Sequence, residues 1–134
     1  MAERIEVTSV DEEHGILASL LHVARAYGNS LAAIVREECN INEDGLRGPY
    51  QNGFHNLLLL KLHQRYKFPP SYDNYNQSGN LVNQIAVIKF SRSFCAWKMK
   101  LRTEYLNSEF AVVQGRCPTI TAEDWEEFKN KNAN

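Results

Sequence analysis

The first third of the chain has the hydrophobic pattern of amphipathic helices. Between residues 16 and 35, apolar side chains recur at three- and four-residue steps, which is the spacing of one helical face. The polar residues 28–30, Gly-Asn-Ser, interrupt this pattern. Because glycine commonly ends a helix and serine commonly begins one, we predict one helix up to residue 28 and a second, short helix over residues 31–39.

A further helix is predicted over residues 54–67, after a polar loop at residues 40–53. Its run of four leucines at 57–60 could alternatively form a short buried strand. No partner strand is evident nearby, so the pattern favours the helix. The proline pair at 69–70 ends this helix, and the polar stretch up to residue 80 is predicted to be a loop.

The longest predicted helix covers residues 81–107. Its large apolar side chains fall within an arc of about 80° around the helix axis. These side chains are Phe90, Phe94, Trp97, Leu101 and Tyr105. Because Trp97 and Tyr105 share the stripe with the others, we interpret them as core residues rather than as platforms for stacked bases.

The same helix carries five basic residues outside the apolar stripe. They are Lys89, Arg92, Lys98, Lys100 and Arg102, and no acidic residue interrupts them. Lys89, Arg92 and Lys100 fall opposite the stripe, whereas Lys98 and Arg102 flank it. These cations are candidates for contacts with a phosphate backbone. A solvated helix face is the alternative, and the sequence leaves both open.

A short C-terminal helix has a specific start signal. Thr121 is predicted to be the N-cap with Asp124 at the third helical position, and Ile120 and Trp125 are spaced as a hydrophobic staple. Trp125 and Phe128 would then face a core.

Together these patterns predict an all-α fold, a small bundle of about five helices with a polar loop near residues 69–80. We divide the chain into an acidic helical segment at 1–67, a loop at 68–80 and a second helical segment at 81–134. The longest apolar run is far shorter than the roughly 18–20 residues of a membrane span, so no membrane partner is expected.

Charge is distributed unevenly along the chain. The 134 residues carry a formal net charge of −1, but residues 1–44 sum to −6, residues 45–110 to +6 and residues 111–134 to −1. The positive middle part indicates an anionic partner. Alternatively, the acidic and basic parts neutralise each other within one fold, and charge sums do not decide between the two.

Candidate catalytic and metal-binding chemistry is sparse. The three cysteines and four histidines show none of the spacings of a metal site. We therefore predict no metal and no cofactor. The thiols, including that of Cys95 in its apolar stretch, are predicted to be buried, and the histidines are predicted to lie at the surface. No nucleophile or nucleotide-loop motif occurs, which predicts a non-catalytic protein. An enzyme whose catalytic residues form no local motif stays a further alternative.

The N-terminal residues are acidic and lack the apolar core of a secretory signal. This pattern predicts an intracellular protein, in which the cysteines stay reduced. The odd number of cysteines agrees with that interpretation.

The C-terminal part of the chain contains two motifs, F-x-x-W-K-x-x-L-x-x-x-Y and P-x-I-T-x-x-D-W-E-x-F. Together they resemble a stretch of the transposase-related proteins of the plant En/Spm (CACTA) group. The matching residues are Phe94, Trp97, Lys98, Leu101, Tyr105, Pro118, Ile120, Thr121, Asp124, Trp125, Glu126 and Phe128. The resemblance covers about a quarter of the chain and implies a transposon-derived protein of the plant nucleus. In that group the stretch continues into a longer polar helix, whereas this chain stops at residues 129–134, which favours a truncated or domesticated copy.

From these residues we predict a DNA-binding protein without catalytic activity. The basic residues of the span 89–102 would contact phosphates. The residues that pack or cap the helices would be Trp97, Leu101, Tyr105, Thr121, Trp125 and Phe128. The alternative is a helical protein-interaction or oligomerisation module that associates through residues 16–35 and binds no nucleic acid.

Overall fold

The computed structural model describes residues 4–7, 10–11, 16–17, 21–42, 52–77 and 79–132. These residues contain five α-helices, namely α1 (Leu21–Glu38), α2 (Asn52–Arg65), α3 (Leu81–Lys100), α4 (Phe110–Arg116) and α5 (Ala122–Asn132). The π-helical segment η2 (Leu101–Tyr105) directly continues α3. The predicted small all-α bundle is therefore confirmed.

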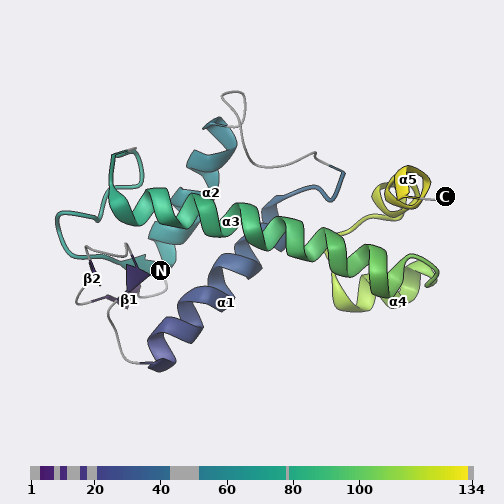
Figure 1. The fold of residues 1–134 in the computed structure, drawn as a ribbon, viewed down its shortest axis with the longest axis horizontal. Helices are drawn as coiled ribbons and strands as arrows, with labels where there is room; N and C mark the ends of the chain where they lie inside the picture. The colour runs from purple at the N-terminus through teal and green to yellow at the C-terminus, as the bar shows by residue number, and fades with distance from the viewer. Residues whose placement is uncertain are drawn as a thin grey trace.

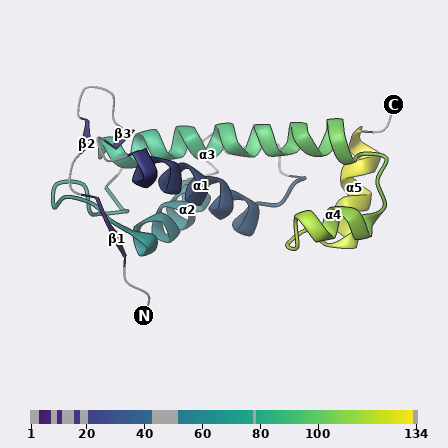
Figure 2. The same ribbon diagram turned by 90° about the horizontal axis from the view of Figure 1, so that it is seen from below.

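The long helix α3 runs through the molecule from one end to the other (Figure 1). Helices α1 and α2 lie against its N-terminal half and against each other, whereas α4 and α5 gather at its C-terminal end (Figure 2). Buried apolar side chains from all five helices belong to one hydrophobic core. None of the helices in the described ranges is long and apolar enough to cross a membrane.

Local sequence explains where α3 begins and which side it buries. The side-chain oxygen of Asn80 accepts hydrogen bonds from the backbone N–H groups of Val82 and Asn83, at 2.9 and 3.3 Å, and so caps the helix. The predicted apolar stripe faces the core: Phe90, Phe94, Trp97 and Leu101 are buried, and Tyr105 is half-buried against them. With η2 included, the helical path ends at residue 105, two residues before the predicted end.

Two predictions for the first third of the chain are wrong. Ile16–Leu17 form a short strand, β3, that pairs antiparallel with β2 (Val10–Asp11), and α1 begins only at residue 21. The helix also passes through Gly28 without a break. A glycine inside a helix costs only about 1 kcal/mol relative to alanine. The buried side chains of Tyr27 and Leu31 on either side hold the helix on the core and outweigh this cost.

A second pair of strands attaches the N-terminal segment to the end of α2. Strand β1 (Ile5–Glu6) pairs in parallel with β4 (Tyr66–Lys67), and the N–H of Val7 donates to the carbonyl of Lys67 at 2.8 Å. Val7 is buried in the core beyond this pair. The sequence pattern did not reveal these strands, because two residues are too few to show an alternation.

The predicted cap of α5 is present. The backbone N–H of Asp124 donates to the hydroxyl oxygen of Thr121 at 3.1 Å, which satisfies one of the unpaired donors of the first turn. Trp125 and Phe128 are buried, with their rings stacked at 5.5 Å between centroids, and Ile120 is buried beside them. These residues pack the helix as predicted.

Hydrogen bonds join α5 to the C-terminal end of α1. Asn42 Nδ2 donates to the carbonyl of Asp124 at 3.0 Å, and the hydroxyl of Thr119 donates to the carbonyl of Arg36 at 2.7 Å. Lys131 Nζ donates to the carbonyl of Asn42 at 3.1 Å. The acidic N-terminal segment therefore packs directly against the C-terminal helices.

Candidate nucleic-acid interface

The five predicted basic residues do not share one face. The ammonium nitrogen of Lys89 lies 6.0 Å from the centroid of the Tyr27 ring, and that of Lys98 lies 5.1 Å from the centroid of the Phe94 ring. Both lysines are partly buried. Cation–π contacts of this kind stabilise the fold by about 0.5–1 kcal/mol each at sites open to water. These two lysines therefore serve packing between helices and within α3.

The other three predicted residues, Arg92, Lys100 and Arg102, are exposed. Lys100 Nζ lies 3.9 Å from a carboxylate oxygen of Glu104, one turn later, and both side chains are more than half exposed. An exposed pair at this distance contributes little to stability. Lys100 therefore remains available to another anion.

Part of the opposed charge seen in the sequence is neutralised between α1 and α2. Arg65 donates to Glu37 at 2.8 Å, and Lys61 Nζ lies 3.9 Å from Glu38. These pairs join the acidic segment to cations of α2. Among the described residues, no such pair joins α1 to the basic residues of α3. Internal neutralisation thus applies to the cations of α2, whereas an anionic partner for the cations of α3 stays a prediction.

Lys100 lines a cavity of about 260 Å³ together with two arginines from other helices, Arg36 of α1 and Arg116 of α4. The aromatic side chains of Trp97 and Tyr105 line the same cavity. We call Arg36, Lys100 and Arg116 the cationic triad. It brings together residues that lie 64 and 16 positions apart in the chain.

Within the part of the chain that the structure describes, carboxylates offset little of the positive charge of the cationic triad. Neither Arg36 nor Arg116 forms an ion pair there, and Lys100 meets only Glu104. Trp97 is 8% exposed, and its buried Nε1–H group has no acceptor among the described residues. Like charges that converge on a cavity raise the local positive potential and favour a bound anion.

Sequence reasoning missed Arg36 and Arg116. Arg36 lies in the acidic first third, directly before Glu37 and Glu38, and Arg116 is an isolated cation. The carboxylates of Glu37 and Glu38 form ion pairs with Arg65 and Lys61, respectively. No local spacing signals that either arginine meets Lys100, because the crossing of α1, α3 and α4 decides it.

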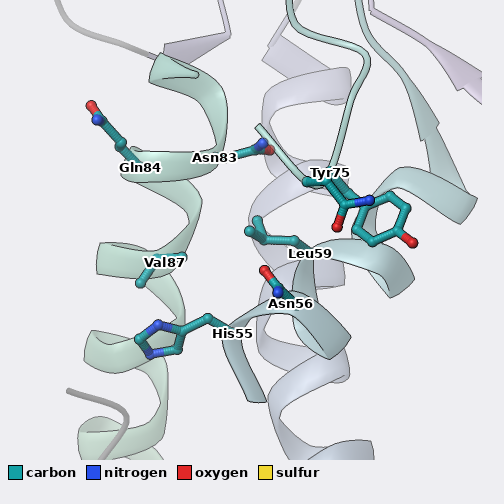
Figure 3. A pocket seen from close by; sticks show the side chains of 8 residues that line it. His55, Asn56, Leu59, Tyr75, Asn83, Gln84 and Val87 are labelled. Atoms are coloured by element: carbon teal, nitrogen blue, oxygen red, sulfur yellow. The ribbon is translucent and has the colours of Figure 1, made fainter. Parts of the chain in front are cut away.

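A second cavity, of about 460 Å³, lies between α2, α3 and the loop that precedes α3 (Figure 3). Its polar lining consists of His55, Asn56, Tyr75, Asn76, Asn83 and Gln84. Leu59 and Val87 supply apolar wall. No charged side chain of the described residues lines it, so this lining differs in chemistry from the cavity at the cationic triad.

A buried polar network supports the wall of this second cavity. Asn83 Nδ2 donates to the carbonyls of Asn74 and Gln77 at 2.8 and 3.1 Å, and its Oδ1 lies 2.8 Å from Nε2 of His63. Because the amide nitrogen is used by two carbonyls, Oδ1 accepts, and Nε2 of His63 carries the proton. His63 Nδ1 lies 3.6 Å from Asp73. The prediction that the histidines lie at the surface is therefore wrong for His63, which is buried.

The cysteines divide into two environments. Cys39 and Cys117 are buried, as predicted, whereas Cys95 is exposed on the outer side of α3. The apolar stretch around Cys95 suggested burial, but its neighbours Phe94 and Trp97 take the core positions. In the described part of the chain, no group of three or more histidine, cysteine or acidic residues is arranged to hold a metal ion.

Comparison with known proteins identifies no relative of this chain. No protein-family model matches it. No curated protein and no solved structure matches it either. The resemblance of the segment Phe94 to Phe128 to the En/Spm group therefore stays a prediction.

Proposed function

We propose that this protein is a non-catalytic, transposon-derived nuclear protein that binds DNA through phosphate contacts. The observation that carries the proposal is the convergence of the cationic triad on one cavity, where the exposed pair of Lys100 with Glu104 is the one ion pair of the triad among the described residues. Arg92 and Arg102, exposed on α3, extend the positive surface. Lys89 and Lys98, which lie against aromatic rings, are left out of the interface.

Arginine suits this role because its planar guanidinium donates two parallel hydrogen bonds to a phosphate. Such contacts release counterions, so the affinity for DNA falls steeply with salt. Phosphate contacts position the protein on the duplex without reading its sequence.

The experiment is a salt titration of binding to a labelled DNA duplex, measured by fluorescence anisotropy on the full chain. The test variant is Lys100→Gln with Arg116→Gln. The control, Arg65→Gln with Lys67→Gln, removes the same charge at the end of α2 and in β4. We expect the plot of log affinity against log salt concentration to be less steep for the test variant, with the magnitude of the slope smaller by about 0.9 for each lost phosphate contact. The control keeps the slope of the unmodified chain. Equal slopes for the test variant and the unmodified chain would refute the proposal.

A protein-interaction module is the second candidate, but on a different surface from the predicted one. Leu31, Ile34 and Val35 of the span 16–35 are buried in the protein's own core, so they cannot meet a second copy. Instead, α3 exposes two apolar side chains on its outer side, Ile88 (44% exposed) and Met99 (58% exposed). If this surface mediates self-association, light scattering shows a dimer that Ile88→Ser with Met99→Ser converts to a monomer.

A further inference from the structure

We infer that the 460 Å³ cavity between α2 and α3 binds an uncharged planar heterocycle with hydrogen-bond donors and acceptors on its edge, and that its biological ligand is a nucleobase, adenine above all. The cavity is separate from the cationic triad and shares no lining residue with it. The inference therefore goes beyond the proposed phosphate binding and does not depend on it.

The lining has the chemistry that a base requires. Asn56 and Asn76 are exposed, and their side-chain amides form no hydrogen bond with any described residue. An asparagine amide matches the N6 and N7 positions of adenine, donating to one and accepting from the other. Tyr75 also lines the cavity.

Figure 3 shows how these side chains are arranged. Asn56 and Leu59 project from α2 and Asn83 from α3, whereas the phenol ring of Tyr75 on the loop points to the side away from Asn83. Gln84 points away from this group, so it lies at the rim. Leu59 is buried and Val87 is half-buried, which gives the cavity an apolar side against which the face of a ring can pack.

The loop wall is held in place before any ligand arrives. Asn83 uses its whole amide to bind His63 and the carbonyls of Asn74 and Gln77. Asn80 Nδ2 donates to the carbonyl of Tyr72 at 2.9 Å. A preformed wall lowers the ordering cost of binding, and a volume of 460 Å³ falls within the range of about 300–1,000 Å³ found for small-molecule sites.

The uncharged side chains of the described lining indicate which part of a nucleotide enters the cavity. Among the described residues, no lysine or arginine lines the cavity to hold a phosphate, and no aspartate or glutamate lines it to bind a cation. An uncharged base fits this lining, whereas a phosphate attached to it would have to remain in solvent. The N6 and N7 edge is open in a duplex as well, but only an unpaired, unstacked base can enter the cavity and pack its ring face against the wall.

The test is isothermal titration of the full chain with adenosine, which carries no phosphate, and with glucose as a hydroxyl-rich ligand without a planar ring. We expect adenosine to bind with a Kd of about 1 mM or tighter, and glucose not to bind. The variant Asn56→Ala with Asn76→Ala should weaken adenosine binding at least fivefold. The control, Asn107→Ala with Gln114→Ala, removes two exposed amides beyond α3 and should bind adenosine like the unmodified chain.

Three outcomes would overturn the inference: no adenosine binding at 10 mM ligand, glucose binding as tight as adenosine, or equal adenosine binding by the Asn56/Asn76 variant. The result is independent of the phosphate proposal. Loss of DNA binding in the Lys100/Arg116 variant, with adenosine binding retained, supports both the phosphate proposal and the nucleobase inference. If one of the two experiments fails, the conclusion tested by the other is unaffected.

Discussion

The ammonium nitrogen of Lys89 on α3 lies 6.0 Å from the centroid of the Tyr27 ring on α1. The Tyr27 ring packs edge-on against Tyr66, with 5.3 Å between centroids, and against Phe68. Lys89 thus closes an aromatic cluster at the contact between α1 and α3. A residue whose charge suggests an anion site is here part of the packing between two helices.

The first prediction concerns Lys89. Lys89→Ala should lower the free energy of unfolding by about 0.5–1 kcal/mol, because it removes the cation and the methylene groups that cover Tyr27. Urea denaturation measures this change. DNA affinity should stay the same. Arg92→Ala, three residues on and exposed, is the matched control and should show the opposite result, with unchanged stability and weaker DNA binding.

The second prediction concerns pH. Burial, together with the neighbouring Tyr66, raises the pKa of the Tyr27 hydroxyl well above its usual value near 10. The unfolded chain therefore ionises Tyr27 at a lower pH than the folded chain does. The stability it contributes is complete well below pH 10 and is lost as pH rises through and above 10, by about 1 kcal/mol at pH 11. Tyr27→Phe should lose less stability between pH 8 and pH 11 than the unmodified chain, by that amount; an identical loss would contradict the pKa assignment.

The third prediction concerns the buried network. Asn83→Ala leaves Nε2 of His63 and the carbonyls of Asn74 and Gln77 without their partner. An unpaired buried polar group costs about 1–3 kcal/mol, and the two carbonyls are only part-buried and can bind water, so the free energy of unfolding should fall by about 1–3 kcal/mol. Denaturation in urea checks the value. The exposed Asn107→Ala should change it by less than about 0.5 kcal/mol.

The fourth prediction concerns inorganic phosphate. If the cationic triad binds anions, phosphate at ten times its Kd should stabilise the protein by about 1.4 kcal/mol, seen as a rise in Tm. Sodium chloride at the same ionic strength should not reproduce the rise. The Lys100→Gln, Arg116→Gln variant should lose it, whereas Arg65→Gln, Lys67→Gln should keep it. A rise that persists in the Lys100/Arg116 variant would place the anion elsewhere.

The local features of the fold follow from residue spacing. The apolar stripe from Phe90 to Leu101 and the cap formed by Thr121 and Asp124 depend on residues within one or a few helical turns of each other. Such patterns can be recognised without tertiary information. The break predicted at Gly28 is wrong because the weak helix propensity of glycine is overridden by the core contacts on both sides of it.

The sequence by itself determined the helical class of this protein, the buried side of its longest helix and the excess of positive charge in its middle part. Only the tertiary structure decided what those charges do. It directs Lys89 to Tyr27, pairs Arg65 with Glu37, and brings Arg36 from the acidic segment to Lys100. The physical reason is that spacing along a helix specifies which residues share a face, whereas the residues that face them depend on how distant helices cross.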